Sequence, residues 1–120
     1  MEKVTGIGGF FFRSREPDRL SAWYRDHLGI NPVPTREGEE SWEQQAGSTA
    51  FAPFPNDSTY FRDPTKGWML NFRVADLSAM VTQLRDAGLH VDVDPEAYPY
   101  GRFARLTDPE GNPIELWEPC

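Results

Sequence analysis

The sequence has 120 residues, 19 of them acidic and 12 basic, which gives a formal net charge of −7. This length suits one domain with one core, and the negative charge excludes nucleic-acid binding, which needs a basic surface. The single cysteine, Cys120, excludes an internal disulfide and a thiolate zinc site. Because we find neither a secretion signal nor an apolar run of about 18 residues, we expect a cytoplasmic protein that contacts no membrane.

The first half of the chain predicts a strand, a helix and two shorter strands. Residues 6–13 are rich in Phe and Ile, which is typical of a strand. A helix is predicted over residues 17–29, because apolar side chains recur with a 3.6-residue period between a proline in the first turn and a closing glycine. The remaining strand candidates are residues 41–46 and 49–54, which follow a proline-containing loop at 31–40.

The second half repeats this order. A strand is predicted over residues 68–74 and a helix over 76–88, where Asp76 suits the N-terminal cap. Shorter strands are predicted at residues 90–93, 102–107 and 113–117, with a loop at 94–101 and a tight turn, Asp-Pro-Glu-Gly-Asn, at 108–112.

The two halves also share a short motif. Leu-Ser-Ala occurs at residues 20–22 and again at 77–79, an offset of 57 residues (20 to 77). We therefore expect a single domain, residues 1–120, made of one module at about 4–61 and a second at about 67–118. A short sheet with one helix cannot bury its own apolar face, so the two modules should share a core.

Three stretches carry a family resemblance. Residues 23–29 are similar to an FYxxxLG helix end, residues 71–77 to the opening of a second module, and residues 108–116 to a closing DPxGNxxEL hairpin. In this order and spacing they resemble the glyoxalase I, bleomycin resistance and dioxygenase superfamily, also called the vicinal oxygen chelate superfamily. The resemblance implies an α+β fold, in which two βαβββ modules form a half-open, eight-stranded cup, and commonly a homodimer.

The resemblance also implies where a metal would bind. The lyases and dioxygenases of the superfamily hold a divalent metal with side chains on the first and last strands of each module. Here the two first-strand positions fall at Gly9 and Met69, and residues 49–54 offer no ligand, so only Glu115 remains. One carboxylate cannot hold a metal. We therefore predict no metal and no other cofactor, with Glu115 as the only candidate for catalysis.

Alternation along the strands predicts which side chains face the cup. Around the symmetric turn at 108–112, Arg105 should lie opposite Glu115, and Phe103 opposite Trp117. The aromatic candidates for the cup are Trp42, Phe54, Tyr60, Tyr100 and Trp117. The predicted ligand-binding residues are Arg13, Trp42, Phe54, Asn71, Arg73, Tyr100, Arg105, Glu115 and Trp117. The alternative interpretation is a cross-strand ion pair between Arg105 and Glu115 and an ordinary aromatic core, without a ligand.

Three functions remain open. The first is a metal-independent protein, similar to the bleomycin resistance members, that binds a small aromatic or cationic molecule; the acidic charge and the aromatic cup favour it. The second is an enzyme, either a metal-dependent lyase, isomerase or dioxygenase of the superfamily or one that uses Glu115 as a general base. For a general base, Arg105 would shift the pKa of the Glu115 carboxyl in the wrong direction. The third is a diverged module without small-molecule chemistry.

Overall fold

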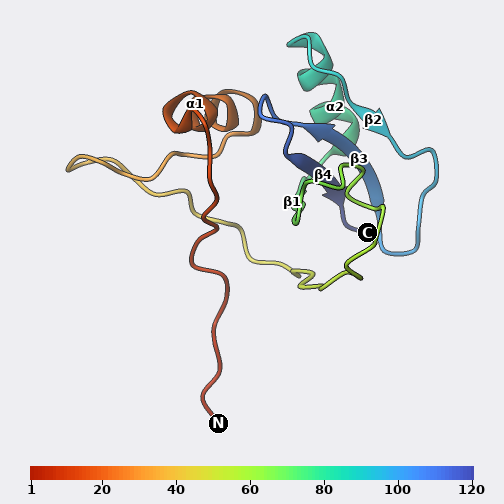
Figure 1. The fold of residues 1–120 in the computed structure, drawn as a ribbon, viewed down its shortest axis with the longest axis horizontal. Helices are drawn as coiled ribbons and strands as arrows, with labels where there is room; N and C mark the ends of the chain where they lie inside the picture. The colour runs from red at the N-terminus through yellow and green to blue at the C-terminus, as the bar shows by residue number, and fades with distance from the viewer.

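The computed structural model describes residues 1–120 as a mixed α+β fold with two helices and one four-stranded sheet (Figure 1). The elements in chain order are α1 (Pro17–Leu28), β1 (Leu70–Arg73), α2 (Leu77–Asp86), β2 (Asp92–Val93), β3 (Arg102–Thr107) and β4 (Pro113–Glu118). The predicted βαβββ order of the second half is thus complete. Neither helix is long and apolar enough to cross a membrane.

The sequence predicts the cap at the C-terminal end of α1 and the cap at the N-terminal end of α2. Gly29 follows α1 with a φ of 71°, and its N–H bonds back to the carbonyl of Arg25 at 3.1 Å. A left-handed backbone of this kind favours glycine. At the start of α2, the Asp76 side chain accepts a hydrogen bond from the backbone N–H of Ala79 at 3.0 Å, which satisfies one of the free N–H groups of the first turn.

The sheet has the order β1-β4-β3-β2, with β1 parallel to β4 and the other pairs antiparallel. The turn between β3 and β4 is built on Asp108, whose buried carboxylate accepts from the backbone N–H groups of Glu110 and Asn112. This turn fixes the register, so that Arg105 lies opposite Glu115, as predicted.

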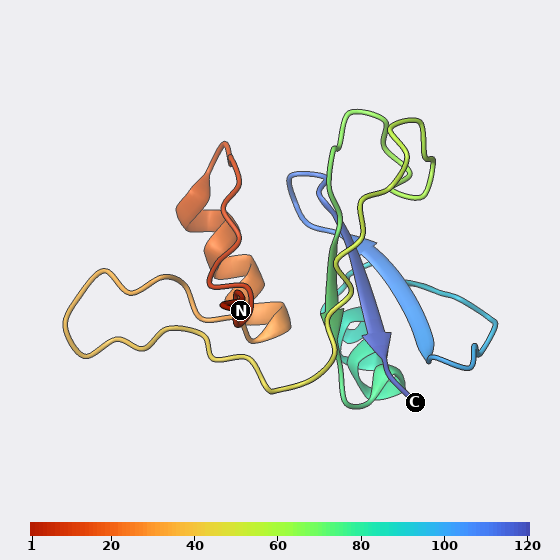
Figure 2. The ribbon, with the colours of Figure 1, turned by 90° about the horizontal axis from the view of Figure 1, so that it is seen from below.

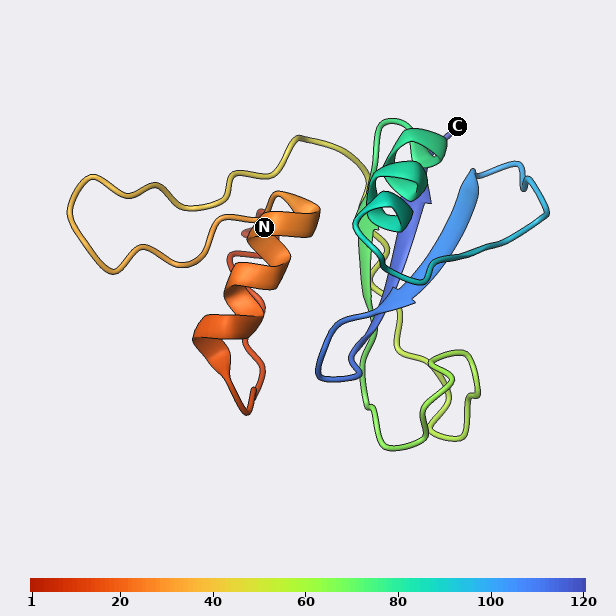
Figure 3. The same cartoon turned by 90° about the horizontal axis from the view of Figure 1, so that it is seen from above.

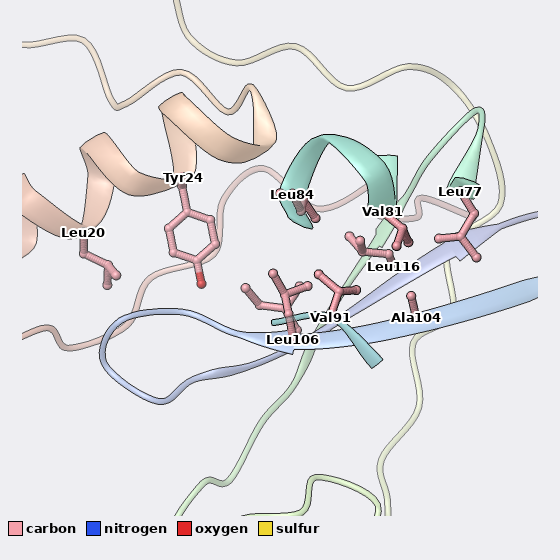
Figure 4. Packing of buried hydrophobic residues seen from close by; sticks show 10 residues of the cluster. Leu20, Tyr24, Leu77, Val81, Leu84, Val91, Ala104, Leu106 and Leu116 are labelled. Atoms are coloured by element: carbon pink, nitrogen blue, oxygen red, sulfur yellow. The ribbon is translucent and has the colours of Figure 1, made fainter. Parts of the chain in front are cut away.

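The core lies between the sheet and the helices. Helix α2 covers one face of the sheet, as Figure 3 shows, and the largest fully buried side chains are those of Leu77, Leu84, Ile114 and Leu116. Helix α1 adds Leu20 and Tyr24 at the turn end of β3 (Figure 4). The ten apolar side chains of this cluster come from α1 and the second half of the chain.

The prediction of eight strands is wrong for the first half. Residues 6–13, 41–46 and 49–54 form no strand, and no backbone hydrogen bond joins them. Gly6, Gly8 and Gly9 lower the strand propensity of the first segment, and Pro53 removes an N–H donor from the third. Residues 41–46 find no strand partner in the structure. The sheet accordingly has four strands and does not close into a cup.

Apart from α1, the first half of the chain forms long irregular segments on both sides of that helix. Figure 2 shows the chain between α1 and β1 making a wide excursion beyond that helix. The radius of gyration is 15.3 Å, compared with about 13.6 Å for a compact domain of this length. Large apolar side chains are left exposed there, among them Phe11 at 90% and Phe51 at 87%.

The turn at 108–112 joins α1 to the sheet. The Tyr24 hydroxyl donates to Asp108 Oδ2 at 2.6 Å inside the core. The Glu110 carboxylate accepts from the Ser14 hydroxyl at 2.7 Å and from the backbone N–H of Arg15 at 2.8 Å, just before the helix begins. These hydrogen bonds hold the first half of the chain on the second.

Candidate functional site

The face of the sheet opposite α2 carries a buried carboxylate. Glu115, on β4, is only 4% exposed. Its Oε1 accepts from the Asn71 amide at 2.8 Å, and its Oε2 accepts from the Tyr60 hydroxyl at 2.6 Å and from Arg105 Nε at 3.2 Å. Asn71 and Arg105 come from the strands on either side of β4, while Tyr60 comes from the irregular segment before β1. The carboxylate therefore has donors on both oxygens, all supplied by the chain itself.

Two titratable side chains, Tyr60 and Arg105, contact this carboxylate. The guanidinium of Arg105 lies over the Tyr60 ring, with Cζ 4.2 Å from the ring centroid. Burial lowers the pKa of Arg105, but its contacts with Tyr60 and Glu115 outweigh burial, so that the net shift is upward. Burial, and then the hydrogen bond to Glu115, raises the pKa of Tyr60. Both shifts keep Arg105 a cation and Tyr60 a neutral phenol at neutral pH.

A cavity of about 930 Å³ opens above Glu115. Residues 50–69 form most of its wall, and the sheet contributes Asn71, Phe103, Glu115 and Trp117. A volume of this size accommodates an organic molecule with several rings.

One wall of the cavity is aromatic. The rings of Phe103 and Trp117 are parallel within 9°, with centroids 6.5 Å apart, and Tyr100 meets Phe103 edge-on. The Trp117 indole N–H donates to the carbonyl of Tyr100 at 2.8 Å, which fixes the indole. Gly101 makes this possible, because a Cβ at that position would lie 2.6 Å from the indole nitrogen. Rings held at fixed angles provide surfaces on which a flat ligand can stack.

Most of the predicted ligand-binding residues meet at this cavity. Phe54, Asn71, Tyr100, Glu115 and Trp117 line it, and Arg105 contacts its floor through Glu115.

The structure places the other three predicted residues elsewhere. Arg13 lies in the exposed N-terminal segment. Trp42 packs against Phe72 with ring centroids 6.3 Å apart, and the Arg73 guanidinium donates to the carbonyl of Gln45 at 2.8 Å. These three side chains do not line the cavity above Glu115.

The role of Tyr60 could not be derived from the sequence. It counted only as one of several aromatic candidates for the cup, whereas in the structure its hydroxyl is a direct partner of Glu115. Strand alternation assigns a direction to a side chain only within a strand, and Tyr60 lies in an irregular segment. The neighbouring aromatic residues Phe54 and Phe61 are the only signal in the sequence.

The donor set at Glu115 does not fit a divalent metal. No group of three or more His, Cys, Asp or Glu side chains converges anywhere in the chain. The expected first-strand positions hold Gly9 and Met69, neither of which offers an oxygen or nitrogen ligand from its side chain. The single carboxylate faces a guanidinium at 3.2 Å, and several converging ligands are needed to hold Mg²⁺, Zn²⁺ or Fe²⁺.

Several solved structures share the fold of this chain. TnmS3, an antibiotic binding protein from Streptomyces sp. CB03234, is similar over 100% of both chains, with 20% identity and a TM-score of 0.67. A glyoxalase/bleomycin resistance protein from the same organism covers 87% of this chain and 92% of its own, with 21% identity and a TM-score of 0.54. A member of the glyoxalase/bleomycin resistance protein/dioxygenase superfamily from Sphaerobacter thermophilus DSM 20745 covers 86% and 88%, with 19% identity and a TM-score of 0.54. At these identities the likeness establishes the fold.

The family follows from the sequence itself. A family model described as a glyoxalase-like domain matches residues 9–117. The chain therefore belongs to the glyoxalase-like domain family, which confirms the resemblance to the glyoxalase, bleomycin resistance and dioxygenase superfamily. No curated protein matches the sequence significantly.

Proposed function

We propose that the chain binds a small aromatic or cationic molecule in the cavity above Glu115, without a metal, in the manner of a bleomycin-resistance-type binding protein. The observation that carries this proposal is the buried Glu115 carboxylate, whose two oxygens are already hydrogen-bonded by Asn71, Tyr60 and Arg105. A carboxylate with these partners suits the polar floor of a binding cavity.

Electrostatics supports the metal-free form of the proposal. A metal at Glu115 would lie close to the guanidinium of Arg105, and like charges at such a distance repel strongly where water is excluded. The metal would also have to displace the donors on the carboxylate, which a single remaining ligand cannot compensate.

Shape and charge support an aromatic or cationic ligand. The cavity wall presents Phe103, Trp117 and Tyr100, and the net charge of −7 attracts cations toward the molecule. The antibiotic binding protein TnmS3 shares the fold over the full length of the chain, which supports a binding role over a catalytic one.

We also propose that the protein acts as a homodimer in the cytoplasm. Phe11, Phe51 and Val33 are 90%, 87% and 76% exposed in the first half of the chain, and apolar surface of this kind is commonly covered by a partner. Size-exclusion chromatography with light scattering tests this, since a mass near twice 13.7 kDa is expected and a monomer at micromolar concentration would contradict it.

Metal analysis tests the metal-free form of the proposal. The protein is purified without chelators, soaked in Zn²⁺, Ni²⁺, Mn²⁺ or Fe²⁺, desalted, and measured by mass spectrometry. We expect far less than one metal per chain, with no difference between the wild type and Glu115→Ala. Stoichiometric metal that is lost in Glu115→Ala would instead favour a metal-dependent lyase or dioxygenase.

A further inference from the structure

The segment before β1 is tied to the sheet by three side chains that lie close together in sequence. Tyr60 bonds to Glu115 at 2.6 Å, Arg62 pairs with Asp92 at 3.1 Å, and Lys66 Nζ reaches Asn112 Oδ1 at 3.2 Å. All three side chains line the cavity, and of these only Tyr60 bonds to Glu115. The phenol of Tyr60 thus lies directly above the Glu115 carboxylate inside the cavity.

Side-chain contacts hold Tyr60 in place: its ring packs against Phe54 with centroids 5.3 Å apart and lies under Arg105. The residue lies outside any helix or strand, and its backbone N–H bonds only to the Ser58 hydroxyl two residues away. Arg62, two residues further on, has a φ of 67°, an unfavourable backbone for a residue other than glycine. The backbone hydrogen bonds of residues 55–66 are all local, and none joins this segment to the sheet. Such a segment opens at a lower free-energy cost than the sheet, so the Tyr60 side chain can leave Glu115 without unfolding the strands.

The two residues beneath Tyr60 are held far more firmly. Arg105 and Glu115 sit on adjacent central strands in direct register, and Glu115 is buried. When Tyr60 leaves, this pair stays in place and presents one free acceptor position on Oε2 beside a guanidinium. The vacated space has the shape and polarity of a phenol: a flat ring under a cation, with a hydroxyl directed at a carboxylate.

We propose that the Tyr60 side chain occupies the ligand position when no ligand is bound. The cavity then binds hydroxyaromatic molecules, whose O–H group replaces that of Tyr60 on Glu115. This inference rests on the proposed binding function and narrows it to a chemical class. A ring without a hydroxyl would leave Glu115 Oε2 with Arg105 as its only donor. The loss of one hydrogen bond to a buried acceptor weakens binding by roughly tenfold.

The pair of probes is 2-naphthol and 2-methoxynaphthalene, which share a ring system and differ in whether the oxygen can donate. Binding to wild-type protein, Tyr60→Ala and Tyr60→Phe is measured by isothermal titration calorimetry in EDTA. We expect Tyr60→Ala to bind 2-naphthol about tenfold more tightly than the wild type does and to prefer it over 2-methoxynaphthalene by about tenfold or more. Tyr60→Phe should gain less, because its ring still fills the space.

Two further variants act as controls. Tyr100→Ala removes another aromatic ring from the same cavity without touching Glu115, so it should not raise the preference for the hydroxyl. Glu115→Gln combined with Tyr60→Ala removes the anionic acceptor and should abolish most of that preference.

The outcomes separate the two levels of the proposal. If Tyr60→Ala binds both probes equally, or gains equally for both, the cavity binds aromatic rings but the hydroxyaromatic inference is wrong. If neither probe binds any variant, the hydroxyaromatic inference is wrong and the aromatic-binding function loses its support as well. If Tyr100→Ala gains the same selectivity as Tyr60→Ala, Tyr60 has no special position.

Discussion

At the scale of single residues, two buried carboxylates organise the molecule in different ways. Asp108 accepts from the turn backbone, from Asn112 and from Tyr24, and so holds structure together. Glu115 accepts from three side chains at the floor of a cavity, and its Tyr60 partner comes from a loosely held segment. The first arrangement is a structural support, whereas the second is suited to exchange of one partner for a ligand.

The Tyr24 hydroxyl can be tested separately from its ring. Tyr24→Phe removes the donor to Asp108 and leaves a buried acceptor with one partner fewer, so the free energy of unfolding should fall by about 1–3 kcal/mol. Urea denaturation measures this change. Tyr98→Phe, which removes a hydroxyl bonded to Asp94 near the surface, is the matched control and should change stability less. Equal effects of the two variants would show that the Tyr24–Asp108 hydrogen bond contributes no more to the free energy of unfolding than one near the surface.

The same residue predicts a pH dependence. Burial, followed by the hydrogen bond to Asp108, raises the pKa of Tyr24 far above its usual 10.0. The unfolded chain then loses this proton first as pH rises, so the contribution of Tyr24 to stability is complete below pH 10 and declines above it, by about 1.4 kcal/mol per pH unit. Denaturation of wild type and Tyr24→Phe between pH 8 and 11 should therefore converge. A constant difference across this range would contradict the assignment.

The sequence allowed much of the site to be predicted residue by residue wherever strands set the directions. The symmetric turn placed Arg105 opposite Glu115 and Phe103 opposite Trp117, and the structure has this register. The partner that came from outside the strands, Tyr60, could not be placed, because an irregular segment has no periodicity from which to infer direction.

At the scale of elements, the start of α1 depends on the turn between β3 and β4. Hydrogen bonds from Ser14, Arg15 and Glu16 lower the pKa of Glu110, with the Ser14 bond the largest cause. Glu110→Gln weakens these bonds, so the Arg15 and Glu16 amides should exchange faster with deuterium.

Acid should have the same effect on the start of α1. A lowered pKa means that the Glu110 contact is complete above the unfolded value of 4.5 and is lost as pH falls through the folded value. Native-state exchange of wild type, corrected for the intrinsic rate, should show this loss of protection at the start of α1, and Glu110→Gln should not. Identical acid profiles for both proteins would show that another group is responsible.

The tip of the loop before β3 depends on one glycine. Gly101 has a φ of 134°, and a Cβ there would collide with the carbonyl of Glu118 and press on the Trp117 indole. Gly101→Ala should therefore destabilise the protein and change its tryptophan fluorescence. Gly88→Ala is the control, since Gly88 has a φ of 86° but open space around it, so it carries only the backbone strain of about 1–2 kcal/mol. If Gly88→Ala were the more damaging change, the close approach of Gly101 to Trp117 would be unimportant.

The helices were easier to predict than the strands for a physical reason. Caps and the 3.6-residue period are local properties, and they marked α1 and α2 to within two residues. A strand forms only when it finds a neighbour, and the segments of the first half have apolar residues but no partner in the structure. Their sequences therefore predicted strands that this chain alone does not form.

At the scale of the whole molecule, the two halves differ in how much regular secondary structure and buried core they contain. The second half holds the sheet and most of the buried core, while the first half contributes α1 and long unpaired segments. In the monomer, amides in residues 1–13 and 31–54 should exchange with deuterium within seconds, whereas those of β3 and β4 should be the slowest in the chain. Slow exchange of residues 6–13 in a dimeric sample, and fast exchange on dilution, would show that a second copy orders this half.

The central claim is that the cavity above Glu115 binds an organic molecule and needs no metal to do so. The most direct test is a thermal-shift screen of aromatic and cationic compounds, run in EDTA and again after loading with Zn²⁺, Ni²⁺, Mn²⁺ or Fe²⁺. A ligand present at 100 times its dissociation constant stabilises the fold by about 2.7 kcal/mol, which raises the melting temperature by several degrees in a chain of this size. We predict compounds that give the same rise with and without metal. Shifts that occur only after metal loading, or a complete absence of shifts, would contradict this account.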